Sequence, residues 1–199
     1  PPVIGAAVFV GGAILLFSGA TPALEDRVAA LRRFVPLPFV ETAHFFGSII
    51  GLWLLILSRG LFRRLNGAHH MTLALLGAGV VFSLLKGIDY EEAFALGYLM
   101  LLLLLSRGAF YRKASMFNQS FSAGWIAVIA ILVGASIWLG VFSYKQILLT
   151  DSLWWDFAYR GDAPRFLRAS VAVSIIGIGL LVFTALKPAA PRGLGTAPD

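Results

Sequence analysis

The residues best suited to chemistry in this sequence are the few charged and polar side chains that border long apolar runs. Glu41, His44 and Ser48 are spaced i, i+3 and i+7, which places them on one face of a helix. Lys86 precedes Asp89 by three residues, where two apolar runs meet, and can reach that carboxylate across a turn. A charge at the centre of a membrane helix costs roughly 2.5–3.5 kcal/mol, so charges held beside apolar segments indicate a candidate site.

Further charges extend this candidate site to both signs. Glu91 follows Asp89, and Arg165 and Arg168 lie three residues apart where the last apolar run begins. The arginine fork suits a phosphate, and the carboxylate of Glu41, Asp89, Glu91 or Glu92 could meet a cation. The pattern predicts a site for a phospholipid headgroup with a phosphate and an added amine. The alternative is that these charges sit at helix ends because water is there, as capping and snorkelling explain. The predicted headgroup-binding residues are Glu41, His44, Lys86, Asp89, Glu91, Arg165 and Arg168.

Motifs for other chemistries are absent from the sequence. Without cysteine, the chain has no disulfide, thiolate metal site or cysteine nucleophile. His69 and His70 are adjacent and point to different sides of a helix, and His44 alone is no ligand set. No glycine-rich phosphate loop, H-E-x-x-H or G-x-S-x-G pattern occurs. We therefore expect no metal, no cofactor and no catalytic residue within this chain.

Composition identifies the elements that position these charges. Of 199 residues, 59% are hydrophobic and only 13% are charged, and the mean hydropathy is +0.85. A soluble fold of this size cannot hide so much apolar surface. Nucleic-acid binding as the main role is excluded despite a net charge of +6, because the few basic residues are scattered between apolar runs. The sequence predicts an all-α, polytopic helical membrane protein.

About six transmembrane helices are expected, since roughly 20 helical residues cross a bilayer. The predicted spans are 3–19, 39–58, 70–86, 90–105, 125–143 and 167–186. The third and fourth are short and joined by the acidic turn 87–92, which predicts a tight hairpin; the alternative makes one of them re-entrant. The amphipathic stretch 21–34 and the aromatic stretch 153–159 are predicted to lie at the membrane interface.

The charges of the loops predict an orientation. Loops 59–70 and 106–124 each carry three Lys or Arg and no acid, whereas the turn 87–92 carries three acids. The positive-inside rule places both basic loops, and both ends of this six-span segment, in the cytoplasm. The four Lys or Arg in 144–168 then lie on the outer side, against the rule. The candidate site falls towards the outer leaflet.

An internal repeat links the two basic loops. The pattern S-R-G-x-F-x-R occurs at 58–64 and again at 106–112, and under the same offset Glu41 falls on Asp89. Each acid precedes its serine by 17 residues, or about 25 Å of helix, so acid and arginine would lie at opposite faces of the membrane. Either the segment is a parallel duplication, or two apolar segments ending in arginine are similar by chance.

Several strings are more specific than composition. They read LPFVETAHF at 37–45, SLLKGIDYEEA at 83–93, FYRKA at 110–114, LWWDF at 153–157 and GDAPRFLRA at 161–169. Together they resemble the multiple peptide resistance factor family, bacterial aminoacyl-phosphatidylglycerol synthases and flippases. The resemblance covers about residues 30–188 and corresponds to the second half of the family's membrane region.

The resemblance implies a function. The family's cytosolic domain moves lysine or alanine from aminoacyl-tRNA to phosphatidylglycerol, and its membrane domain carries the product to the outer leaflet, which weakens binding of cationic antimicrobial peptides. The synthase domain is absent here, so no transferase residue can be assigned, whether the chain is an enzyme stays open, and tRNA is a partner only through that domain. We expect a flippase-type membrane domain over 1–188 and a linker over 189–199, in a piece of a longer protein.

Two functions of different class follow from this resemblance. The first is translocation of aminoacylated phosphatidylglycerol across the bacterial cytoplasmic membrane. The second is a membrane anchor and lipid-substrate funnel for the synthase. Gly11-Gly12 and Gly177-x-Gly179 are expected to pack against helices, and glycine-rich faces of this kind favour a homodimer.

Overall fold

The computed structural model describes residues 2–21, 37–112, 122–143 and 162–185. Its helices are α1 (Pro2–Ser18), α3 (Leu37–Phe62), α4 (Asn66–Gly87), α5 (Tyr90–Leu105), α6 (Ala123–Ser143) and α8 (Asp162–Ala185), with a single 3-10 turn at Arg107–Ala109. Within these ranges no strand forms, and one isolated bridge is the extent of β pairing. The all-α prediction is confirmed. The predicted interfacial stretches and the predicted 189–199 linker lie outside the described residues.

Each predicted span coincides with a helix. Three helical segments are long and apolar enough to cross a membrane, namely Thr42–Phe62, Asn66–Gly87 and Gly124–Ser143, and shorter apolar stretches lie in α1 and α8. Helices suit such sequences because every backbone polar group is satisfied within the segment. The structure therefore agrees with a polytopic helical membrane protein.

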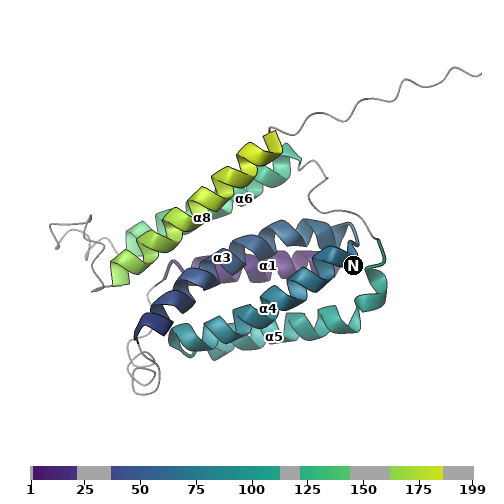
Figure 1. The fold of residues 1–199 in the computed structure, drawn as a ribbon, viewed down its shortest axis with the longest axis horizontal. Coiled ribbons are helices and arrows are strands. Elements are labelled where there is room, and N and C mark those ends of the chain that lie inside the picture. Colours follow the sequence, from purple (N-terminus) through teal and green to yellow (C-terminus); the bar gives the residue numbers. More distant parts are fainter. Residues whose placement is uncertain (1, 22–36, 113–121, 144–161, 186–199) are drawn as a thin grey trace, which may run out of the picture.

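Helices α1, α3, α4 and α5 pack into a bundle, and α6 and α8 lie as an antiparallel pair across it (Figure 1). Helix α3 is central: 67% of its most apolar window is buried, against 33% for α4 and 11% for α6. The bundle core is built from buried leucines of all four helices, including Leu15, Leu54, Leu76 and Leu96. Most of the surface of α6 is left for lipid or another partner.

Glycines bring α1 and α3 into backbone contact. A Cβ on Gly12 would lie 2.8 Å from the carbonyl oxygen of Gly51, and a Cβ on Gly51 would lie 2.8 Å from that of Gly12. The packing role predicted for this part of α1 is confirmed. For Gly177 and Gly179 the prediction stays open: nothing in the described part of the chain lies within 4 Å of their Cβ positions, so no described helix covers that face of α8.

The predicted hairpin between the third and fourth spans is confirmed. Helix α4 ends at Gly87 and α5 begins at Tyr90; α4 is long and apolar enough to cross a membrane, and the 16-residue α5 is not among the helices that meet this criterion. The N–H groups of Ile88 and Asp89 donate to carbonyl oxygens of the last turn of α4 at 3.0 and 3.1 Å. Ile88 closes the turn in the left-handed region, with φ of 54°, which is a strained conformation for a β-branched residue.

The two copies of the repeated pattern end side by side. Leu65 and Arg112 form a parallel bridge, in which the N–H of Arg112 donates to the carbonyl of Arg64 at 3.2 Å and that of Asn66 donates to the carbonyl of Arg112 at 3.0 Å. The basic residues before and after this bridge therefore gather at one end of the bundle. The acidic turn between α4 and α5 lies at the other end (Figure 1).

Candidate polar site at the acidic end of the bundle

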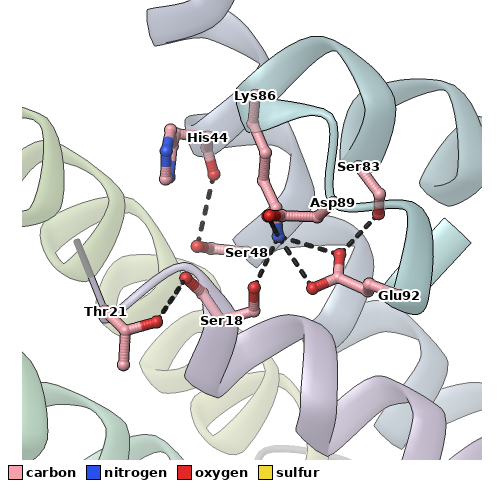
Figure 2. A network of polar contacts seen from close by, with 8 residues as sticks. All are labelled: Ser18, Thr21, His44, Ser48, Ser83, Lys86, Asp89 and Glu92. Atoms are coloured by element: carbon pink, nitrogen blue, oxygen red, sulfur yellow. Dashed lines mark hydrogen bonds and ion pairs between the residues drawn. The ribbon is translucent and has the colours of Figure 1, made fainter. Parts of the chain in front are cut away.

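The centre of the candidate site is the ammonium group of Lys86, in the last turn of α4. The residue is 1% exposed and is among the largest fully buried side chains described. Its Nζ donates to both carboxylate oxygens of Glu92 at 2.8 Å and to Oγ of Ser18 at 2.6 Å (Figure 2). A cation at a helix C-terminus and an anion at a helix N-terminus are both favoured by the helix dipoles. Their sequence positions therefore suit the charges they carry.

The predicted pairing of Lys86 with Asp89 is confirmed, but it is the longer of two ion pairs. Nζ lies 3.6 Å from Oδ2 of Asp89 and 2.8 Å from Glu92. The side chain of Asp89 is 25% exposed and that of Glu92 is 7% exposed. Asp89 thus forms the outer edge of the network, and Glu92 holds Lys86 from inside.

Glu92 is one of the four carboxylates that the sequence offers for a cation, but the predicted set of headgroup-binding residues leaves it out. A signal for it exists in the sequence, because Glu92, Leu96 and Leu103 fall on the buried face of α5. Its Oε1 also accepts a hydrogen bond from the hydroxyl of Ser83, which is itself fully buried. The spacing alone suggested Asp89, which is nearer to Lys86 in sequence. The orientation of α5 decides that Glu92 faces the ammonium.

The network joins three helices. Helix α1 is distant in sequence from the other two, α4 and α5, which are consecutive. Ser18 ends α1, Ser83 and Lys86 belong to α4, and Glu92 belongs to α5. Buried charges of this kind are tolerated when each is paired and hydrogen-bonded, and removing one partner leaves an uncompensated charge that costs about 3–5 kcal/mol. The ion pair therefore fixes α4 to α5, and the hydrogen bond from Lys86 to Ser18 ties the end of α1 to this hairpin.

Ser48 and His44 lie next to this network on α3 (Figure 2). The hydroxyl of Ser48 donates to the carbonyl of His44 at 3.4 Å. Ser48 also lines a cavity of about 10 Å³ between α1, α3, α6 and α8, together with Gly19, Ser136 and Ser170. This volume is at the lower limit for one water molecule. Polar groups thus continue from the Lys86 network towards α6 and α8.

The remaining predicted residues are placed by their helices. Glu91 is exposed in the first turn of α5. Glu41 lies near the start of α3, and Arg165 and Arg168 lie near the start of α8. Both starts are at the same end of the molecule as the acidic turn (Figure 1). The structure brings Lys86 and Asp89 into contact. It places the helix segments that carry the other predicted residues at the same end of the molecule, but it does not describe the side chains of Glu41, Arg165 and Arg168.

The opposite end of the bundle is basic. Arg63, Arg64, Arg107 and Arg112 are exposed there, and Nη1 of Arg59 donates to Oγ of Ser122 at 3.0 Å. The two histidines at this end have different environments. His69 is buried, with Nε2 hydrogen-bonded to the carbonyl of Leu103 at 3.0 Å, and His70 is exposed with Nδ1 bonded to the carbonyl of Asn66 at 2.9 Å. Within the described ranges no three His, Asp or Glu are grouped to hold a metal ion.

Comparison with known proteins gives one informative similarity. No family model matches the chain. Over 200 aligned residues, covering 96% of the chain, it is 25% identical to the phosphatidylglycerol lysyltransferase of Bacillus subtilis (strain 168). The chain spans only 22% of the length of that protein. What it resembles is therefore one part of a much longer protein, in agreement at this coarse level with the resemblance seen in the sequence.

Proposed function

We propose that this chain is a membrane module that moves aminoacylated phosphatidylglycerol, carrying lysine or alanine, from the inner to the outer leaflet. The observation that carries the proposal is the buried Lys86–Glu92 pair at one end of an apolar helical bundle. Intramembrane charges are costly, and they mark sites where charged ligands pass or bind. The similar Bacillus protein is named for lysine transfer to phosphatidylglycerol, which supports the lipid class.

The proposed headgroup site has carboxylates for the amine and cations for the phosphate. It comprises Glu41, His44, Lys86, Asp89, Glu91, Arg165 and Arg168, to which the structure adds Glu92. Opposite signs at one end of the bundle suit a headgroup that itself carries both signs. Lipid acyl chains would follow the apolar outer faces of the helices.

We place the chain in the bacterial cytoplasmic membrane with its basic end and both ends of the segment in the cytoplasm. Residues 1–188 then form the transmembrane domain and 189–199 the linker to a cytosolic synthase, through which tRNA takes part. A homodimer is proposed from the open glycine face of α8. Export of a cationic lipid lowers the negative charge of the outer surface and so gives resistance to cationic antimicrobial peptides.

A second candidate function is a membrane anchor and substrate funnel for the synthase. The similar protein is named a phosphatidylglycerol lysyltransferase, a name that describes synthesis and not transport. The exposed arginines at the basic end suit an anionic lipid substrate approaching from the cytoplasmic leaflet. In this case the acidic-end network is a structural support for the helices.

The two functions are separated by measuring product amount and product sidedness in the same cells. Cells expressing the chain with an active synthase are analysed for total aminoacylated phosphatidylglycerol and for its outer-leaflet fraction. For Lys86→Ala, Glu41→Ala and Arg165→Ala we expect unchanged total product with a reduced outer fraction, and Ile175→Ala, on an exposed face of α8, serves as the control. Reduced total product with unchanged sidedness supports the funnel instead and contradicts translocation.

A further inference from the structure

The polar groups around Lys86 form a cradle for a primary ammonium. Four acceptor atoms face Nζ, namely Oε1 and Oε2 of Glu92, Oγ of Ser18 and Oδ2 of Asp89. They come from α1, α5 and the turn before α5. An ammonium has three donors and no acceptor, so a set of oxygens with two carboxylates matches it. The structure thus shows this cradle occupied by the chain's own alkylammonium.

The cradle is graded from its edge to its interior. Asp89 is 25% exposed by its side chain and lies 3.6 Å from Nζ, whereas Glu92 is 7% exposed and lies 2.8 Å from it. A cation that approaches the acidic end therefore meets Asp89 before Glu92. The strained left-handed backbone of Ile88 lies directly beside Asp89, in the turn that connects the two helices.

A headgroup that carries an ammonium and a phosphate can replace this ion pair without leaving a bare charge. Its ammonium takes the carboxylates, and its phosphate takes the ammonium of Lys86. Before the exchange Lys86 is paired with the carboxylates; after it, the headgroup ammonium is paired with the carboxylates and Lys86 with the phosphate. No charge is therefore left unpaired in a low-dielectric site. The lysine stem is long and flexible, which lets the ammonium follow a new partner over several ångströms.

We propose that Lys86 and Glu92 form an exchangeable ion pair, and that Glu92 is the group that recognises the primary ammonium of an aminoacylated lipid headgroup. This inference rests on the proposed function and names the chemical group that its site reads. Exchange also removes the 2.6 Å hydrogen bond from Lys86 to Ser18, the last residue of α1. Binding of the headgroup therefore loosens the end of α1 from the α4–α5 hairpin.

The first test is chemical rescue of the full chain purified in nanodiscs. Lys86→Ala removes the internal ammonium and leaves space in the cradle, so the unfolding temperature falls. Added butylammonium chloride is expected to restore a large part of that loss, whereas butanol and sodium chloride at equal concentration are not. In Lys86→Ala/Glu92→Gln the rescue by butylammonium disappears. Equal rescue by butanol, or none by butylammonium, overturns the proposed ammonium site.

The second test leaves the network intact and so does not depend on a charge variant that folds. The sequence has no cysteine, so Ala20→Cys, at a residue 1% exposed just after α1, gives a single reporter for maleimide labelling. Vesicles containing alanyl-phosphatidylglycerol are expected to raise the labelling rate several-fold over vesicles of phosphatidylglycerol alone. Ala68→Cys, buried at the basic end, is the matched control and is expected not to change.

The outcomes of these tests are distinct from those of the proposed function. An unchanged labelling rate at position 20, or an equal rise at position 68, overturns the coupling of headgroup binding to α1. Butylammonium rescue involves no lipid transport, so its failure contradicts the exchange while translocation can still be observed. Reduced total product with unchanged sidedness in the cell assay contradicts the proposed function, while the ammonium cradle can still show rescue.

Discussion

The bundle of α1, α3, α4 and α5 and the pair of α6 and α8 are equally apolar but are held in different ways. In the bundle, Gly12 and Gly51 bring backbones into contact and Lys86 is buried with its partners. In the pair, Gly134 and Gly177 have nothing within 4 Å of their Cβ positions. Among the described side chains, this backbone contact and the buried Lys86 network therefore belong to the bundle and not to the pair.

The two regions are joined by a second apolar cluster, in which Leu16, Leu55 and Val173 are buried, and by a few ring and hydrogen-bond contacts. Trp125, near the start of α6, packs against Phe9 and Phe62 with ring centroids at 5.3 and 5.9 Å. The hydroxyl of Ser136 donates to the carbonyl of Leu16 at 3.2 Å. Further along α6, Trp138 stacks on Phe142 instead, and both rings face outwards. The contacting side of the pair is thus packed against the bundle, and its other side is exposed.

The largest effect is expected from breaking the ion pair of the bundle. Glu92→Ala leaves the ammonium of Lys86 buried without its main partner, which lowers the free energy of unfolding by about 3–5 kcal/mol. Unfolding in detergent is the measurement. The double variant Lys86→Met/Glu92→Leu removes both charges and should be more stable than Glu92→Ala. If the double variant is the less stable of the two, the buried charge is not the source of the loss.

A comparison of aliphatic residues sharpens the contrast between the regions. Leu54 is fully buried in the bundle, and Ile131 on α6 is 68% exposed. Leu54→Ala opens a cavity and is expected to cost about 2–5 kcal/mol. Ile131→Ala removes a side chain that faces lipid and is expected to change stability by about 0.5 kcal/mol or less. Similar losses in detergent unfolding would show that α6 is packed as tightly as α3.

Glycine variants test the same contrast with a single methyl group. Gly12→Ala places a Cβ against the backbone of Gly51, so α1 must shift, at a cost of about 1–3 kcal/mol. In the single chain Gly177→Ala meets open space and is expected to stabilise α8 by about 0.5–1 kcal/mol, whereas a homodimer packed on this face reverses the sign. Thermal unfolding of the two variants in nanodiscs gives the comparison. A loss for Gly177→Ala would reveal a partner on that face.

The smallest effect is expected at the hairpin turn. Ile88→Asn puts a residue that tolerates the left-handed region at φ of 54°, and should stabilise the chain by up to about 1 kcal/mol. The same change makes the turn beside Asp89 less strained without touching the Lys86–Glu92 pair. Thermal unfolding measures the gain. A destabilised variant would mean that the exposed isoleucine side chain matters more than its backbone strain.

The sequence was sufficient to predict the helices, the hairpin and the Lys86–Asp89 pair. Apolar runs of sufficient length predicted the six long helices of the described residues, and the short acidic connection predicted the hairpin, because both depend on local composition. The Lys86–Asp89 pair was within reach for the same reason. Glu92 as the main partner depends on how α5 is rotated, and the bond to Ser18 joins residues 68 positions apart. Such contacts follow from tertiary packing, which spacing along the chain does not encode.

Two glycine motifs also show that tertiary packing is not evident from the sequence. Gly11-Gly12 and Gly177-x-Gly179 look alike in sequence, and both motifs lie on apolar helices. A Cβ on Gly11 would lie 2.8 Å from Cδ1 of Leu99, whereas the glycines of α8 face open space. Whether a small residue is a packing position depends on the neighbour that approaches it.

The central claim is that the acidic-end network handles an ammonium-bearing lipid on its way across the membrane. Its most direct test is the outward transfer of fluorescent alanyl-phosphatidylglycerol in proteoliposomes that contain the full chain, compared with Glu92→Gln and with protein-free vesicles. If the network handles the lipid, transfer by the original chain is well above the protein-free rate, and transfer by Glu92→Gln falls to that rate. Transfer by the original chain that equals the protein-free rate, or transfer that is unchanged in Glu92→Gln, would contradict it.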